Sequence, residues 1–182
     1  MPANMSHIIP RFQKFIEGQK LFFVATAAAD GRVNLSPKGL DTLRVLSPNR
    51  VVWLSLSGSG NETATHLREL NRITLMFCAF EEPALTLRVY GTAAVYHPAD
   101  DRFKELIDLF PRLGGSRQIF DVTVDLVQTS CGTGVPIFEL KHDRGAEELV
   151  PFYDAMSEDE LRAFWTKKNT RSLDGKDTGI FG

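Results

Sequence analysis

The strongest constraint on the fold is that stretches of β-type sequence follow one another in pairs joined by short turns. Asp30-Gly31, Ser47-Pro48-Asn49 and Glu82-Pro83 supply the turn signals. Strands are expected at residues 20–29, 33–37, 43–46, 50–56, 73–80, 85–97 and 118–130. Because these strands form hairpins and do not alternate with helices one by one, the pattern favours an antiparallel barrel over a doubly wound sheet.

Helices are expected at the periphery of this barrel. The segment IIPRFQKFIEG is amphipathic, and Ser157 with Glu160 forms a capping box that opens a helix running to about Lys168. Two further helices are expected at residues 61–70 and 99–110. Gly91 interrupts the strand at 85–97, which indicates a bulge or a barrel corner.

Length and composition limit the class of protein. The 182 residues predict one domain over 1–182, and the net charge of −2 argues against a general nucleic-acid or anionic-membrane surface. Lys20 and the following LFFVATAAA imitate a signal peptide, but charged residues precede this run and it is too short to span a membrane. It is interpreted as a buried strand of a cytoplasmic protein.

The cysteines and histidines give no sign of a disulfide framework or a metal site. Cys78 and Cys131 lie in apolar, strand-like surroundings, so both are expected to be buried free thiols. The four histidines lack the spacing of metal ligands, and no metal is expected.

The segment Gly58-Ser59-Gly60-Asn61-Glu62-Thr63 connects a strand to a helix. Asn61 is a favoured N-cap residue, and the amides that follow it have no partner inside the helix. A phosphate group could take these amides and the hydroxyl of Thr63, with favourable interaction from the helix dipole. An ordinary capped helix is the alternative. The segment is neither a dinucleotide fingerprint nor a Walker loop.

A second polar stretch is found where the strand at 33–37 ends. Alternation along a strand puts Asn34, Ser36 and Lys38 on one face, in an otherwise apolar neighbourhood. The lysine is either the solvated end of a strand or a second positive group for a phosphate. The C-terminal KKNTRSLDGKDTGIFG has the composition of a disordered segment unless it is docked on the domain.

Together these stretches resemble a known family. FVATAAADGRVNLSPKG, SGSGNETATHLREL, ITLMFCAF and LRVYGTAAVY are similar to segments of the pyridoxamine 5′-phosphate oxidase-like family of FMN-binding split barrels. VDLVQTSCGTGVP and NTRSLDG resemble a bacterial branch of that family whose substrates are mostly unassigned. The resemblance runs from about residue 8 to residue 178, and its specificity comes from the order and spacing of the motifs.

The resemblance implies a mainly β fold with peripheral helices, a six-stranded antiparallel Greek-key split barrel, and a homodimer with FMN in grooves between the subunits. The strand at 34–38 would lie along the flavin ring, with Lys38 towards the phosphate or N1. The C-terminal helix and tail, residues 157–182, would fold over the pocket. The cofactor-binding residues so implied are Asn34, Ser36, Lys38, Ser55, Asn61, Glu62, Thr63, Thr86, Arg88, Asn169, Arg171 and Ser172, with Thr86 and Arg88 coming from the second subunit.

Two departures from the family pattern bear on function. Val33 and the Asn-Glu-Thr segment stand where the true oxidases carry an arginine and an Arg-Lys pair, so phosphate binding would depend on amides and hydroxyls. The C-terminal motif for pyridoxal phosphate has no counterpart either, so pyridoxamine phosphate is not the expected substrate.

The resulting expectation is an FMN-dependent oxidoreductase that transfers hydride through flavin N5 to or from an unidentified small molecule. No residue stands out as a catalytic acid or base. Arg88, Tyr90 and Arg171 are candidates for substrate contact. The alternatives are a flavin carrier or sensor without turnover, or the same barrel binding F420 or haem.

Overall fold

Antiparallel pairing joins the strands into one sheet in the computed structural model, which describes residues 4–181. The strand order is β3-β2-β6-β7-β8-β5-β4, and β1 pairs with β8. The strands are β1 (Asn4–Met5), β2 (Phe22–Thr26), β3 (Asn34–Lys38), β4 (Leu43–Ser47), β5 (Arg50–Leu56), β6 (Ile73–Cys78), β7 (Thr86–Tyr96) and β8 (Ser116–Ser130). The predicted antiparallel, mainly β class is confirmed.

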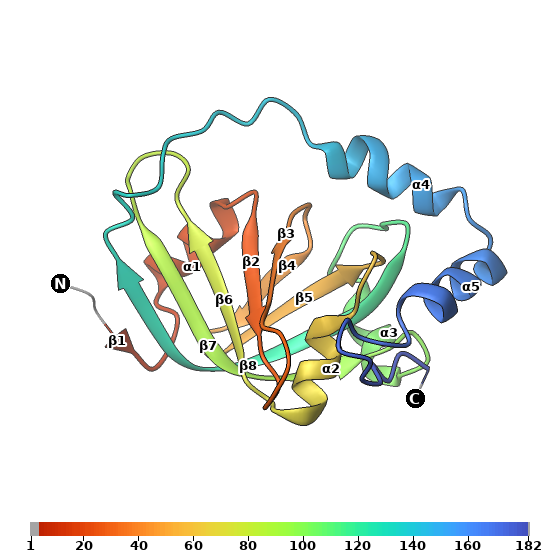
Figure 1. Cartoon of the computed structure of the whole chain (residues 1–182). Helices are drawn as coiled ribbons and strands as arrows, with labels where there is room; N and C mark the ends of the chain where they lie inside the picture. The colour runs from red at the N-terminus through yellow and green to blue at the C-terminus, as the bar shows by residue number, and fades with distance from the viewer. Residues whose placement is uncertain (1–3, 182) are drawn as a thin grey trace.

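The sheet has eight strands, whereas the resemblance implied a six-stranded barrel. The two-residue β1 adds to the C-terminal half of β8, where Asn4 is opposite Gln128. Within residues 4–181, β3 and β4 form the two ends of the strand order, and no ladder joins them. The sheet is therefore strongly curved but is not closed by pairing (Figure 1).

The expected helices are present, and two unexpected short ones precede the last. They are α1 (Pro10–Gly18), α2 (Glu62–Glu69), α3 (Asp101–Ile107), the π-helix η1 (Gly145–Leu149), α4 (Val150–Asp154) and α5 (Glu158–Lys168). The capping box of α5 is confirmed, since the Glu160 amide donates to Ser157 Oγ at 3.3 Å and Ser157 N donates to Glu160 Oε2 at 2.8 Å. In residues 4–181 no helix combines the length and the apolar character needed to cross a membrane.

The main core lies between the curved sheet and α1. Trp53 of β5 and Phe120 of β8 stack with their ring centroids 4.0 Å apart, and Phe22 of β2 meets the edge of Trp53. Phe12 and Ile16 of α1 are buried against the same cluster, so the predicted apolar face of this helix is confirmed. A smaller cluster under α3 is built from Val52, Leu54, Phe103, Leu106, Phe110 and Ile119.

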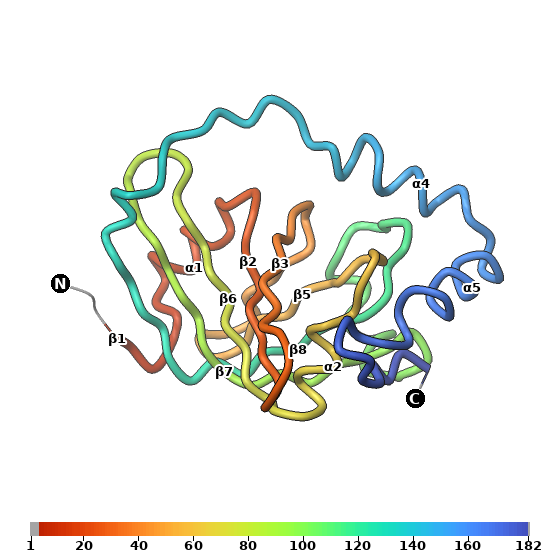
Figure 2. The backbone as a smooth tube through the Cα atoms, viewed as in Figure 1, coloured from red at the N-terminus to blue at the C-terminus, as the bar shows by residue number. Residues whose placement is uncertain are grey.

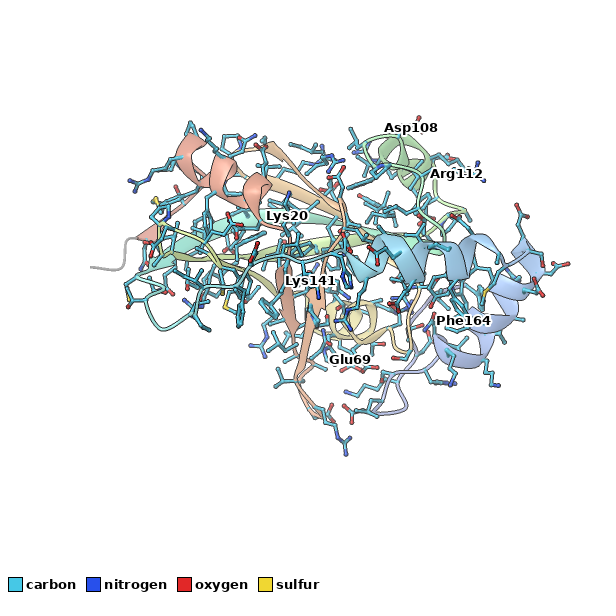
Figure 3. All side chains as sticks on the ribbon, turned by 90° about the horizontal axis from the view of Figure 1, so that it is seen from above. Lys20, Glu69, Asp108, Arg112, Lys141 and Phe164 are labelled. Carbon is cyan, nitrogen blue, oxygen red and sulfur yellow. The ribbon has the colours of Figure 1, made fainter. Side chains whose placement is uncertain are left out.

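The chain after β8 takes a long exposed path before it returns to the domain. Residues 131–144 arch over the strands and lead to η1 and α4 (Figure 1). Seen from above, Lys141 of this segment lies over the middle of the molecule (Figure 3). Cys131 is exposed at its start, so the expectation of a buried thiol is wrong for Cys131 and confirmed for Cys78. The reason is that Cys131 follows the last residue of β8 and leaves the sheet.

Gly91 lies at a β-bulge, which is one of the two possibilities that the sequence indicated for this position. The register between β7 and β8 shifts there, because Tyr90 is opposite Leu126 while Gly91 is opposite Val124. The backbones approach so closely that a Cβ at Gly91 would lie 1.9 Å from the carbonyl oxygen of Thr123. Only a residue without a side chain fits this position.

We expect Gly91→Ala to lower the free energy of unfolding by about 1–3 kcal/mol, because β7 and β8 must move apart to admit the methyl group. Urea denaturation measures this change. Gly18→Ala is the matched control, since a Cβ there meets no atom within 4 Å, and its effect should stay within about 1 kcal/mol. Equal midpoints for the two variants would contradict the proposed clash.

Candidate functional site

A cavity of about 980 Å³ opens between β3, β5 and the N-terminal end of α2. Polar groups of all three elements line one side of the cavity. The opposite side is lined by residues 143–152, a segment that we call the roof. The roof contributes Asp143, Arg144, Gly145, Glu148, Leu149 and Phe152. Apolar side chains at Leu21, Pro37, Leu40, Leu54, Leu56 and Phe120 also line the cavity.

Asn61 occupies the N-cap position of α2, as expected, but its side chain makes no capping hydrogen bond. Its exposed fraction is 3%, and both Oδ1 and Nδ2 are buried without a partner in the described chain. The predicted N-cap position of Asn61 is therefore confirmed, although its side chain does not cap the helix. A buried amide without partners costs free energy of about 1–3 kcal/mol, so this side chain is suited to a ligand in the cavity that it lines.

The amides around Asn61 are also unused. Within residues 4–181, no hydrogen bond is donated by the backbone amides of residues 59–64. The N-terminal end of a helix carries a partial positive charge, and free amides at this end favour an anion.

Besides the exposed Arg144 of the roof, two cations that are more buried line the same cavity. Lys38 ends β3, and Arg117 lies at the start of β8. Arg117 is 4% exposed; its Nη1 donates to the Gly60 carbonyl at 2.9 Å, and its Nε has no partner in the described chain. Neither cation takes part in any salt bridge found among residues 4–181.

The pKa values reflect this arrangement. Burial, followed by the charge of Arg117, lowers the pKa of Lys38 to about 8. Burial lowers the pKa of Arg117 to about 10. Because the folded chain holds the Lys38 proton less tightly than the unfolded chain does, the charged lysine reduces stability; this cost is fully present below about pH 8 and disappears as the pH rises to 10.5. A bound anion would offset this cost, so the pair is suited to negatively charged ligands.

A bulge explains why Arg117 points into the cavity. Ser55 of β5 is opposite Gln118, while Leu56 is opposite Ser116, which leaves Arg117 as the extra residue of β8. A bulge of this kind redirects a side chain out of the normal alternation. Sequence reasoning missed Arg117 because it began the strand at residue 118 and because the bulge depends on the pairing of two distant strands.

Asn34 sets the direction of the hydroxyl of Thr63. Its Nδ2 donates to Thr63 Oγ1 at 3.2 Å and to Thr26 Oγ1 at 3.3 Å. Thr26 Oγ1 in turn lies 3.0 Å from His66 Nδ1 inside the domain. Since the Thr63 oxygen accepts from Asn34, its own proton remains available to an acceptor in the cavity.

The structure brings together seven of the twelve residues expected to bind a cofactor. The alternation predicted for β3 is confirmed, because Leu35 and Pro37 are exposed. Asn34, Ser36 and Lys38 are half-buried. The residues that line the cavity are Asn34, Ser36, Lys38, Ser55, Asn61, Glu62 and Thr63. Those outside the lining are Thr86, Arg88, Asn169, Arg171 and Ser172.

Thr86 and Arg88 belong to β7 and do not line the cavity of their own chain. Arg88 Nη1 donates to Ser130 Oγ on the neighbouring strand at 3.3 Å. Their expected role required a second subunit, and it stays a prediction.

The C-terminal tail, residues 169–181, packs beside α2 and does not contribute to the lining of the cavity (Figure 2). The Leu173 amide donates to Glu62 Oε1 at 2.9 Å, and Lys176 Nζ donates to Glu69 Oε2 at 2.8 Å. Asp174 pairs with Arg32 beyond β2. A tail with the composition of a disordered segment is ordered here because its charged groups and amides have partners on the domain.

The three tail residues expected at the pocket have other contacts. Asn169 is fully buried, and its Nδ2 donates to the Gly58 carbonyl at 2.9 Å. Arg171 is exposed and donates to the Gly175 carbonyl at 3.4 Å, while Ser172 Oγ accepts from the Lys176 amide. The segment over the cavity is instead the roof, which carries no motif that sequence reasoning had singled out.

Taken together, the fold and the site define an antiparallel β protein with a cavity at the start of a helix, where Lys38, Arg117 and unpartnered hydrogen-bond donors gather. Residues 8–131 match the family model of pyridoxamine 5′-phosphate oxidase. A pyridoxamine 5′-phosphate oxidase family protein of Aspergillus flavus, ustO, is 36% identical over 191 residues, which cover 96% of this chain and 77% of that relative. The chain belongs to the pyridoxamine 5′-phosphate oxidase family.

Two solved structures share the fold. A candidate pyridoxamine 5′-phosphate oxidase from Lactobacillus delbrueckii has a TM-score of 0.56 and 21% identity, covering 69% of this chain and 97% of its own. HupZ of Group A Streptococcus, in a variant form, has a TM-score of 0.55 and 20% identity, covering 68% of this chain and 99% of its own.

We predict that Lys38 titrates near pH 8 in the free protein and that Arg117→Met raises its pKa, because a like charge is removed. The pKa should remain below 10.5, since burial is the larger cause. The rate of acylation of Lys38 against pH, followed by peptide mass spectrometry, measures both values. Arg112→Met is the matched control, because Arg112 is exposed and lies outside the cavity. A Lys38 pKa that is the same in both variants would rule out the proximity of the two charges.

Proposed function

We propose that this protein is an FMN-binding flavoprotein and an oxidoreductase that acts on an unidentified small molecule. The observation that carries the proposal is the group of unpartnered polar atoms at one end of the cavity, namely the side chain of Asn61, Nε of Arg117 and the amides of residues 59–64. Membership of the family supports it, since the resemblance implies FMN. The residues present fit a phosphate ester with an attached ring system.

In this proposal the phosphate is held by charge and by hydrogen-bond donors together. Lys38 and Arg117 balance its two negative charges, and the Thr63 hydroxyl and the helix amides donate to its oxygens. The amide of Glu62 belongs to this group, while its carboxylate is engaged with the tail. The part of the cavity lined by Ser36, Ser55 and apolar side chains would then hold the ring.

When bound, FMN would supply a hydride acceptor and donor at N5 of its ring. The chain would bind the phosphate, orient the ring along β3 and reduce the access of water through the roof. No histidine, cysteine or tyrosine lines the cavity in the described part of the chain. We therefore assign binding and orientation to the protein and name no acid or base.

We further propose that the working form is a homodimer with FMN at the subunit interface. Thr86 and Arg88 are outside the cavity of their own chain, so a second copy would have to present them to it. Large apolar side chains are exposed on β3 and on the arch after β8, as an interface requires: Leu35, Ile137, Phe138 and Leu140. Sedimentation velocity tests this, and a flavin-loaded monomer would contradict it.

The substrate is proposed to differ from pyridoxamine phosphate. Val33 precedes β3 and is exposed, where the true oxidases are expected to carry an arginine. Arg88, Tyr90 and Arg171 remain proposals for substrate contact, although none of them lines the cavity of its own chain.

A carrier or sensor without turnover is the second candidate, and it is favoured because no histidine, cysteine or tyrosine is found in the described lining, whose titratable side chains are Lys38, Glu62, Asp143 and Glu148 besides the arginines. A visible spectrum of the purified protein separates flavin from F420 and haem. Anaerobic addition of NADH, NADPH or reduced F420 then shows whether the bound group is reduced. A colourless protein that takes up no FMN on titration would overturn both candidates.

We expect Thr63→Ala and Lys38→Ala each to weaken FMN binding by about 1–3 kcal/mol, because each removes a donor to a charged phosphate. Fluorescence titration of the apoprotein measures the Kd. Riboflavin, which lacks the phosphate, is the control ligand and should bind both variants and the wild type alike. Unchanged FMN affinity in both variants would refute the assignment of the phosphate site.

The affinity for FMN should fall on both sides of neutral pH. Above about pH 8 the free protein loses the Lys38 proton that the phosphate requires, and below about pH 6 the phosphate becomes a monoanion. The charged groups that also line the cavity are Glu62, Arg117, Asp143, Arg144 and Glu148.

Lys38→Arg is the matched variant for this pH dependence, because arginine keeps its charge throughout the range. Titrations from pH 5 to 10 in this variant should lose the alkaline fall and keep the acid fall. An alkaline fall that persists in Lys38→Arg would mean that another group is responsible.

A further inference from the structure

The C-terminal part of the chain contacts the loop before α2 at two points and the first residue of α2 at a third. Trp165 Nε1 of α5 donates to Ser57 Oγ at 2.7 Å. Asn169 Nδ2 donates to the Gly58 carbonyl at 2.9 Å, and the Leu173 amide donates to Glu62 Oε1 at 2.9 Å.

The contact at Gly58 determines how the next peptide is oriented. In a trans peptide the N–H group points away from the carbonyl group. Because Asn169 binds the Gly58 carbonyl and does not line the cavity, the Ser59 amide is turned away from the tail. Ser59 itself lines the cavity, and its amide has no partner in the described chain.

The hydrogen bond between Asn169 and the Gly58 carbonyl is made by a side chain with little freedom to move. Asn169 has no exposed surface, its backbone carbonyl accepts from Thr178 Oγ1, and its amide donates to the Trp165 carbonyl at 2.7 Å. The residue is therefore fixed by its own backbone and has one side-chain donor aimed at the loop. Gly58 and Gly60 permit other backbone conformations, and the Gly60 carbonyl is held separately by Arg117, so the Asn169 contact acts on the Gly58–Ser59 peptide.

We propose that Asn169 is a positioning residue that keeps loop 58–61 in the conformation that accepts a phosphate, and so sets the preference of the site for a phosphorylated flavin over riboflavin. The inference rests on the proposed function. In this proposal the C-terminal segment determines how well the cavity binds a phosphate group, and it does not contact the flavin ring.

The test compares Asn169→Asp, which has the same shape but no donor for the Gly58 carbonyl, with the wild type. FMN affinity should fall by about tenfold to a hundredfold, while riboflavin affinity stays within about threefold. The phosphorus NMR resonance of bound FMN should move towards that of the free ligand, which a merely structural role would not produce. Trp165→Phe, which keeps an aromatic side chain but removes the indole N–H group, should shift the ratio of affinities in the same direction.

Leu173→Ala is the matched control, because its side chain is exposed and its backbone contact to Glu62 is kept. Thermal unfolding of each apoprotein shows whether the variants fold. Equal losses of FMN and riboflavin affinity in Asn169→Asp, or no loss, would overturn the inference while leaving the proposed function intact. A wild type that binds no FMN would overturn the proposed function itself.

Discussion

Strand β8 is the element on which both the fold and the site depend. Its fifteen residues pair with β7 along one edge and with β5 and β1 along the other. The bulge at its beginning turns Arg117 into the cavity, and its far end leads into the arch that carries the roof. The ladder that stabilises the sheet thus also fixes the position of the most buried charge at the site.

Burying Arg117 close to Lys38 lowers the stability of the folded protein, because both side chains lose solvation of their charges. Two cations are held near each other at the edge of an apolar core, without a carboxylate partner in the described chain. Native proteins retain such unfavourable groups where a ligand requires them. A ligand that binds only the folded state returns the lost stability in proportion to its concentration and affinity. If the proposed function holds, folding and ligand binding are linked through Lys38 and Arg117.

The local features of the sequence predicted the parts of the site that local structure determines. The period-two alternation of a strand places Ser36 and Lys38 on one face, whatever the fold. The capping box of α5 and the free amides at the start of α2 follow from the few residues around them. The antiparallel class followed from hairpin spacing, which needs no knowledge of the third dimension.

The parts that sequence reasoning missed or misplaced all depend on contacts between distant segments. Arg117 reaches the cavity only because β5 and β8 pair with a bulge. Asn61 occupies the predicted N-cap position, but local sequence did not reveal that its side chain makes no capping hydrogen bond and is buried in a space that β3 and β8 help to form. The contact between Asn169 and the Gly58 carbonyl likewise could not be predicted, since nothing in NTRSLDG reveals which part of the domain the tail will meet.

The long separation in sequence between the loop and its supports also has a consequence for how the protein is made. A ribosome synthesises residues 58–62 more than one hundred positions before the residues that hold them, as the Gly58–Asn169 and Glu62–Leu173 pairs show. Domains fold as units once enough of the chain has emerged. The sheet can therefore assemble during translation, but the loop acquires its final shape only after residue 173 has left the ribosomal tunnel. A nascent chain halted before that point would contain a folded sheet and an unfinished pocket.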